Sequence, residues 1–90
     1  MNLTDKAFIP DSVMARQVGD ETVILDLASG NYFGLDGVGG YIWQLMNDGK
    51  TLVEICDAVQ AKYDVARSDI ERDLLALAAD LQSRRLIALQ

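Results

Sequence analysis

The chain has 90 residues, half of them apolar, and 14 acidic against 8 basic residues, for a net charge of −6. This length supports one small domain over residues 1–90, in which we expect residues 1–12 to form a frayed arm. Nucleic-acid binding needs clustered Lys and Arg, so the acidic balance argues against such a partner. No apolar run approaches the roughly 18 residues that span a bilayer, so no membrane partner is expected.

The residue types also exclude most catalytic and metal chemistry. The sequence has no histidine and one cysteine, Cys56, so neither a Cys-His pair nor a His/Cys metal set can form. We therefore predict a protein that is not an enzyme and that uses no metal or cofactor. A lone cysteine and the lack of a visible signal peptide indicate a cytoplasmic chain.

The first predicted strand is Val13–Val18. Gly19-Asp20 supplies a two-residue turn to the next strand, which places Met14 opposite Leu25 and Arg16 opposite Val23. The three strands of this region should then form an antiparallel meander.

Residues 21–36 read as a β-hairpin, because apolar residues alternate on both sides of a Gly-containing turn. A two-residue loop would pair Asp26 with Phe33. A three-residue loop ending at Gly30 would pair Leu25 with Phe33, and we predict this register because it gathers apolar residues on one face. It also pairs Val23 with Leu35 and assigns to the opposite face Ile24, Asp26, Tyr32 and Gly34. The second strand of this hairpin is an edge of the meander.

The periodicity then changes to that of a helix capped by Asp36. Its apolar stripe is Val38, Tyr41, Ile42, Leu45 and Met46. Asn47-Asp48-Gly49 ends it, and Trp43 is interpreted as a core anchor. A T-x-x-E capping box opens a second helix, whose stripe is Leu52, Ile55, Cys56, Val59 and Tyr63.

A second capping box, Ser68-x-x-Glu71, predicts a third helix that runs to about Arg85. Its core stripe is Ile70, Leu74, Leu77 and Leu81. Arg84 and Arg85 are expected in its last turn, where cations suit the helix dipole. Residues 86–89 are an apolar tail that can pack back on the core.

Three strands followed by three helices predict an α+β fold of the winged helix-turn-helix type. Such folds often bind DNA through the third helix. Here that helix carries four acidic residues, Asp69, Glu71, Asp73 and Asp80, against Arg72 alone, and phosphates would repel it. The scaffold must therefore serve another function.

A longer set of residues resembles the PqqD-like family of small peptide-recognition proteins. The resembling features are Gly30 with the strand Tyr32-Phe33-Gly34-Leu35, then Gly40-x-Ile42-Trp43, Gly49-x-Thr51 and Glu54-Ile55, with Arg72-Asp73 and Leu77 further on. The likeness covers roughly residues 13–89. Within this family, the sequence is most similar to the B1 proteins of lasso-peptide biosynthesis. The quinone-pathway members of the family remain an alternative.

The resemblance implies binding of the leader segment of a ribosomally synthesised precursor peptide. The leader would add as a strand to the third meander strand, beside the third helix. The residues expected to bind it are Asn31, Tyr32, Phe33, Gly34, Leu35, Asp69, Arg72, Asp73, Ala76, Leu77 and Asp80. In lasso pathways the implied partners are a B2-type cysteine leader peptidase and a cyclase. In quinone-type pathways the partner is a radical SAM enzyme.

Overall fold

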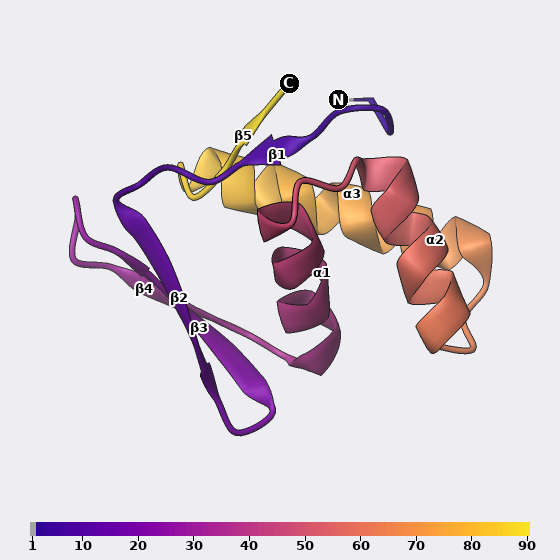
Figure 1. Ribbon diagram of the computed structural model, residues 1–90, viewed down its shortest axis with the longest axis horizontal. Coiled ribbons are helices and arrows are strands. Elements are labelled where there is room, and N and C mark those ends of the chain that lie inside the picture. The colour runs from indigo at the N-terminus through magenta and orange to yellow at the C-terminus, as the bar shows by residue number, and fades with distance from the viewer. Residues whose placement is uncertain (1) are drawn as a thin grey trace.

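The computed structural model describes residues 2–90, and Figure 1 shows the arrangement of its strands and helices. The elements in chain order are β1 (Ala7–Phe8), β2 (Val13–Val18), β3 (Glu21–Asp26), β4 (Tyr32–Leu35), α1 (Gly37–Asn47), α2 (Leu52–Lys62), α3 (Arg67–Ser83) and β5 (Ala88–Leu89).

The predicted fold class is confirmed. Strands β2, β3 and β4 form an antiparallel sheet in that order, so β2 and β4 are its two edges. The three helices follow, and α2 and α3 make the helix-turn-helix pair. In Figure 1 the β2–β3 hairpin projects away from α2 and α3, and α1 lies between them and the sheet.

The sheet has a different register from the predicted one at its second hairpin. The β2–β3 pairing is as predicted, with Met14 opposite Leu25. Between β3 and β4, however, Ile24 lies opposite Phe33, and Thr22 lies opposite Leu35. The prediction that Leu25 pairs with Phe33 was wrong by one residue, and the pairing of Val23 with Leu35 was wrong for the same reason.

The hairpin loop explains the shift, because Asp26 closes a longer loop than expected. Its carboxylate accepts hydrogen bonds from the Ala28 N–H at 3.1 Å and the Ser29 hydroxyl at 2.9 Å. Its own N–H donates to the Asn31 carbonyl at 2.9 Å. Gly30 takes the left-handed conformation, with φ 77°, as predicted. A side chain that bonds to the turn backbone thus selects a four-residue loop.

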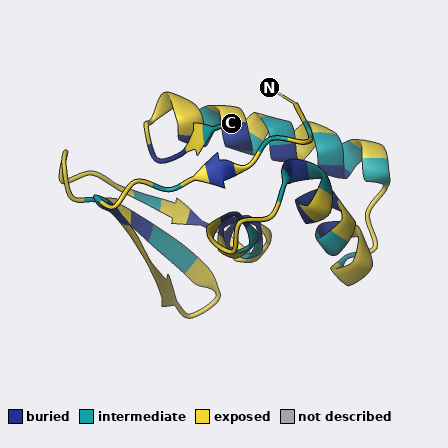
Figure 2. Ribbon diagram, turned by 45° about the horizontal axis from the view of Figure 1, so that its top comes forward, coloured by how far each residue is buried: buried dark blue, intermediate teal, exposed yellow. Residues whose placement is uncertain are grey.

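This register turns the opposite face of β3 toward the core. Ile24 is fully buried and Leu35 is 6% exposed, whereas Leu25 is 36% exposed. Side chains opposite each other share a face, so the outer face of the sheet carries apolar residues in contact with solvent. Those with the largest exposure on β2, β3 and β4 are Met14, Val18, Leu25 and Tyr32. Figure 2 shows the exposed hairpin.

Two glycines let α1 approach the sheet closely. A Cβ atom on Gly40 would collide with Thr22 Oγ1, and one on Gly39 would lie 3.3 Å from Leu35 Cβ. The backbone of the helix therefore packs directly against side chains of the sheet at this point. Asp36 caps α1 as predicted, because its carboxylate accepts the Gly39 N–H at 2.8 Å.

The helix starts follow local signals in two cases of three. Thr51 and Glu54 form the predicted reciprocal capping box of α2. The predicted box at Ser68 is wrong: α3 begins at Arg67 and has no side-chain cap. The Glu71 carboxylate instead accepts a hydrogen bond from Arg67 Nε at 3.2 Å, one turn earlier on the same helix.

The end of α3 is a Schellman motif, and the two arginines expected in its last turn follow it instead. Leu86 N–H donates to the Leu81 carbonyl at 3.0 Å, and Arg85 N–H to the Gln82 carbonyl at 3.0 Å. Arg85 adopts φ 60° to make this turn, and Arg84 is the C-cap residue. The motif directs buried Leu86 into the core, as expected of the apolar tail.

The chain termini are paired with each other, which differs from the expected frayed arm. Ala7 and Phe8 in β1 lie opposite Leu89 and Ala88 in β5. Ala7 is only 6% exposed. The carbonyl of Asp5 also accepts the Leu52 N–H at 2.9 Å. Met1, the first residue of the expected arm, lies outside the described residues.

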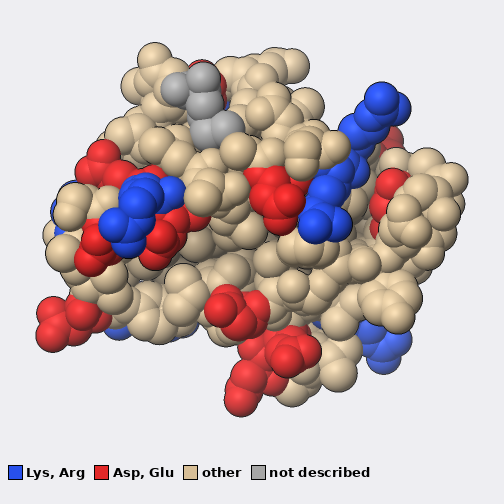
Figure 3. Space-filling model, turned by 180° about the vertical axis from the view of Figure 1, so that it is seen from behind, with Lys and Arg blue, Asp and Glu red and all other residues tan. Residues whose placement is uncertain are grey.

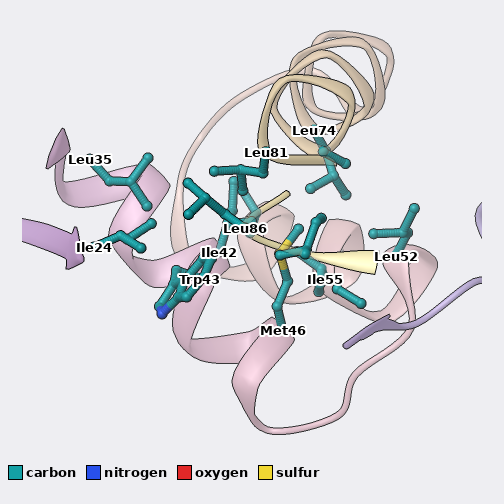
Figure 4. Packing of buried hydrophobic residues seen from close by; sticks show 14 of the residues in the cluster. Ile24, Leu35, Ile42, Trp43, Met46, Leu52, Ile55, Leu74, Leu81 and Leu86 are labelled. Atoms are coloured by element: carbon teal, nitrogen blue, oxygen red, sulfur yellow. The ribbon is translucent and has the colours of Figure 1, made fainter. Parts of the chain in front are cut away.

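One hydrophobic core joins the sheet, the helices and the tail, as Figure 4 shows. Trp43 is 5% exposed and Cys56 is fully buried, which confirms both as core residues. The predicted stripe of α2 is buried apart from half-buried Tyr63. Among the described residues, no helix combines the length and apolar character needed to cross a membrane.

Candidate functional site

The outer edge of the sheet at β4 opens onto a cleft of about 670 Å³ between β4, α1 and α3. Apolar side chains form most of its walls. The lining residues are Phe33, Gly34, Leu35, Asp36, Val38, Gly39, Ile42, Val59, Tyr63, Val65, Ile70, Asp73, Leu74 and Leu77. An apolar cleft beside an exposed strand can accept the alternate side chains of an extended peptide.

The β4 edge presents backbone hydrogen-bonding groups. Because Asp26 N–H bonds to the Asn31 carbonyl and antiparallel ladders alternate, Phe33 and Leu35 direct their backbone groups toward β3. Tyr32 and Gly34 therefore point their N–H and C=O groups away from the sheet. A Cβ atom on Gly34 would meet nothing within 4 Å, so the strand is accessible at its centre.

The α3 side of the cleft differs from the predicted wall. The prediction placed Asp69, Asp73, Ala76 and Asp80 on the binding face. The structure brings only Asp73 of these to the cleft, together with Ile70, Leu74 and Leu77. The wall is therefore mainly apolar, because the helix turns the flank of its core stripe toward β4.

Three of the predicted acidic residues are already paired with arginines. Arg72 lies 3.2 Å from Asp69 and 3.4 Å from Asp73. Arg84 Nε lies 3.1 Å from Asp80. These exposed pairs leave less unbalanced negative charge beside the cleft than the sequence suggests.

The eleven predicted site residues thus divide into two groups. Phe33, Gly34, Leu35, Asp73 and Leu77 line the cleft. The remaining residues do not line it and lie just before or on the edge strand or on α3, and these are Asn31, Tyr32, Asp69, Arg72, Ala76 and Asp80. Of this second group, Tyr32 offers its backbone to the edge, and the residue is 77% exposed on the outer face.

Sequence reasoning missed the contribution of α1 and of the α2–α3 turn to the cleft. Val38 and Val65 are 39% and 44% exposed, and both line it. Tyr63, from the C-terminal end of α2, closes the same wall. Val38 and Tyr63 belong to the predicted apolar stripes of the first and second helices, but no signal within one helix pairs them with Val65 of the turn, and only the tertiary packing brings the three together.

An ion-pair cluster fixes α2 against α3 behind the cleft. Arg67 Nη1 lies 2.6 Å from Asp57 Oδ1 and 3.0 Å from Gln60 Oε1. The hydrogen bond that Arg67 donates to the Asp57 carboxylate raises the pKa of the Arg67 guanidinium. Nearby, burial raises the pKa of the Cys56 thiol, which keeps it protonated and unreactive.

Sequence comparison agrees with this geometry. Residues 21–87 match the sequence profile described as "Coenzyme PQQ synthesis protein D (PqqD)". The chain belongs to the PqqD family. Proteins of the PqqD family are non-catalytic peptide-binding domains, so the prediction that the chain is not an enzyme is confirmed. A search of curated protein sequences found no match.

Two solved structures resemble this PqqD-family protein over most of their length. One, "TbiB1 in Complex with the TbiA(beta) Leader Peptide", has 44% identity and a TM-score of 0.84, covering 88% of this chain and 92% of that one. The other, "Lasso peptide synthetase B1 complexed with the leader peptide", has 26% identity and a TM-score of 0.85, covering 92% and 98%. The predicted resemblance to the PqqD-like family and to B1 proteins is confirmed.

Proposed function

We propose that this PqqD-family protein binds the leader segment of a ribosomally synthesised precursor peptide in lasso-peptide biosynthesis and delivers it to a leader peptidase. The leader adds to β4 as a fourth strand and places alternate side chains in the cleft. The observation that carries the proposal is the open β4 edge beside an apolar cleft. The two similar structures, both described as complexes with leader peptides, support it.

Backbone hydrogen bonds and buried side chains both contribute to the free energy of leader binding. Each backbone hydrogen bond to Tyr32 or Gly34 contributes only about 0.5–1.5 kcal/mol net and does not depend on sequence. Selectivity must come from apolar leader side chains that enter the cleft, at about 25 cal/mol per Å² of buried apolar surface. Ile70 and Leu77 of α3 line this cleft together with Phe33 and Leu35 of the sheet. We therefore propose a leader motif with two or more apolar residues at alternate positions.

The peptidase needs a surface of its own, and the outer face of the sheet fits that role. Met14, Val18 and Tyr32 are each more than half exposed there. Exposed apolar patches of this kind mark protein interfaces. Tyr32 belongs to β4, so the patch continues directly into the edge that receives the leader. A peptidase seated on this face would contact both the protein and its bound leader.

Titration with a fluorescently labelled leader tests the first part of the proposal. Leu77→Asp puts a charge in the cleft and should weaken binding at least tenfold, because an unpaired carboxylate opposes burial of an apolar side chain. Ala79→Asp is the matched control, since Ala79 is exposed on the same helix and does not line the cleft. Equal affinities for the two variants would contradict leader binding in this cleft.

A peptidase assay tests delivery separately. Leu25→Lys on the outer face should keep the leader affinity but abolish stimulation of precursor cleavage by the purified peptidase. If leader affinity and stimulation always fell together across outer-face variants, the separate docking surface would be wrong. The quinone-pathway alternative predicts instead that a radical SAM enzyme, and no peptidase, responds to the leader complex.

A further inference from the structure

A second groove lies at the opposite edge of the sheet, between β2 and α1. Its volume is about 610 Å³. Ala15 and Gln17 line it from β2, and Tyr41 and Gln44 line it from α1. Tyr63 is the one lining residue that this groove shares with the cleft beside β4. The sheet thus has an open edge with an adjoining groove on each side.

The β2 edge has the same backbone chemistry as the β4 edge. The Leu27 N–H donates to the Ser12 carbonyl, which sets the alternation along β2. Met14 and Arg16 therefore bond toward β3, and Ala15 and Gln17 direct their N–H and C=O groups outward. The side chains of Ala15 and Gln17 lie on the inner face of the sheet but remain exposed, because α1 covers β3 and β4 and leaves β2 open.

The charges of the two grooves have opposite sign. The ionised residues that line the β2 groove are Arg16, Lys62 and Asp20, which sum to +1. The β4 cleft is lined by Asp36 and Asp73, which sum to −2. The positive sum for the β2 groove contrasts with the net charge of −6 of the whole chain. Figure 3 shows how acidic side chains spread over one face of the molecule.

Lys62 is held at this groove by aromatic contacts. Its Nζ lies 4.2 Å from the centroid of the Tyr41 ring and 5.9 Å from that of Tyr63. The two rings meet edge to face at 6.3 Å. No ion pair to Lys62 is present within residues 2–90. The ammonium is thus positioned by cation–π contacts and open to an external carboxylate.

We propose that the β2 groove binds an extended acidic segment of a partner protein, which adds to β2 as a strand and pairs a carboxylate with Lys62. The backbone of Ala15 and Gln17 supplies the strand pairing. Lys62, a lining cation with no ion pair within residues 2–90, favours acidic over cationic side chains in the bound segment. Because the two occupants use different edges of one sheet, both can bind at once.

Amide chemical-shift mapping on the labelled protein tests this inference. The probe is a capped octapeptide that alternates threonine with glutamate, and its counterpart has lysine in place of glutamate. The acidic peptide should shift the amides of Ala15, Gln17 and Lys62 at low salt. Lys62→Gln should weaken it about two- to fivefold, the scale of one exposed ion pair. Lys50→Gln is the matched control, since Lys50 is exposed and lines neither groove.

A backbone variant separates strand pairing from simple charge attraction. Ala15→Pro removes one outward donor without removing a bond to β3, so the fold should survive while peptide binding is lost. The inference is overturned if the acidic peptide shifts only Tyr32 and Gly34, if it shifts nothing, or if the lysine peptide binds the β2 groove as tightly. Normal binding to a folded Ala15→Pro protein would also overturn it. None of these outcomes depends on whether a leader binds at β4.

Discussion

The guanidinium carbon of Arg84 lies 4.5 Å from the centroid of the Phe33 ring. Arg84 is the C-cap residue of α3 and Phe33 belongs to β4, so this contact joins the two walls of the cleft at one end. Asp80 Oδ1, 3.1 Å from Arg84 Nε, holds the guanidinium in place. Asp80 therefore acts on the cleft indirectly, through the arginine.

Arg84→Ala should lower the free energy of unfolding by about 0.5–1 kcal/mol, the value of an exposed cation–π contact. It should also weaken leader binding, because β4 loses its contact with α3. Urea denaturation and leader titration measure the two effects. Arg72→Ala is the control, since Arg72 pairs only with neighbours on its own helix. If both variants bind leader equally well, Arg84 does not shape the cleft.

Gly34→Pro tests strand addition at β4 without breaking the sheet. The Gly34 N–H points outward, so proline removes a donor for the leader and none for β3. We expect at least tenfold weaker leader binding at a nearly unchanged melting temperature. Gly34→Ala should bind normally, because its Cβ meets no atom within 4 Å. A proline variant that binds as well as the alanine variant would refute β-augmentation.

Arg85→Gly should stabilise the protein by about 0.5–1 kcal/mol, because a left-handed residue with a Cβ is strained and glycine is not. Arg85 has φ 60° at the end of α3. Thermal unfolding of the variant beside wild type measures the gain. A loss of stability would mean that the arginine side chain contributes more than the strain costs.

Glu54 should contribute to stability only above acidic pH. The Thr51 backbone N–H and hydroxyl donate to its carboxylate at 2.8 and 3.0 Å and lower the pKa of Glu54 in the folded state. Because the pKa of Glu54 is lower in the folded state, its carboxylate stabilises the fold at pH values above the unfolded-state pKa of about 4.3. This stabilisation is lost as the pH falls through the folded-state pKa. The difference in melting temperature between wild type and Glu54→Gln should shrink as the pH drops below about 4. A constant difference across that range would contradict it.

Cys56→Ala should lower stability by about 1 kcal/mol through lost packing and leave leader binding intact. The thiol is fully buried and its pKa is raised by burial, so it should also react slowly with iodoacetamide. Mass spectrometry of the native and urea-unfolded protein measures the rates. Fast labelling of the folded protein would show that the thiol is accessible.

Local sequence signals determined the helices well. The Asp36 cap, the capping box formed by Thr51 and Glu54, and the apolar stripes depend on residues within one or two turns of each other. The edge position of β4 also followed from the order of short connections along the chain. These features need no information about distant residues, and the family resemblance rests on the same regularities.

Tertiary structure decided the register of β4 and the composition of the cleft. Both faces of the hairpin are apolar, with Leu25 on one side and Ile24 on the other, so the alternation alone did not select the buried face. The choice depended on the loop hydrogen bonds of Asp26 and on packing against α1, where Gly39 and Gly40 leave room for Leu35 and Thr22.

The rotation of α3 was decided in the same way. Burial of Ile70, Leu74 and Leu81 sets which side of α3 faces the core, and the ion pair between Arg67 and Asp57 joins this helix to α2. Residues from four elements then meet in one cleft, among them Val38, Tyr63 and Val65. Their sequence positions share no period, because the cleft is formed by packing between elements and not by a pattern within any one of them.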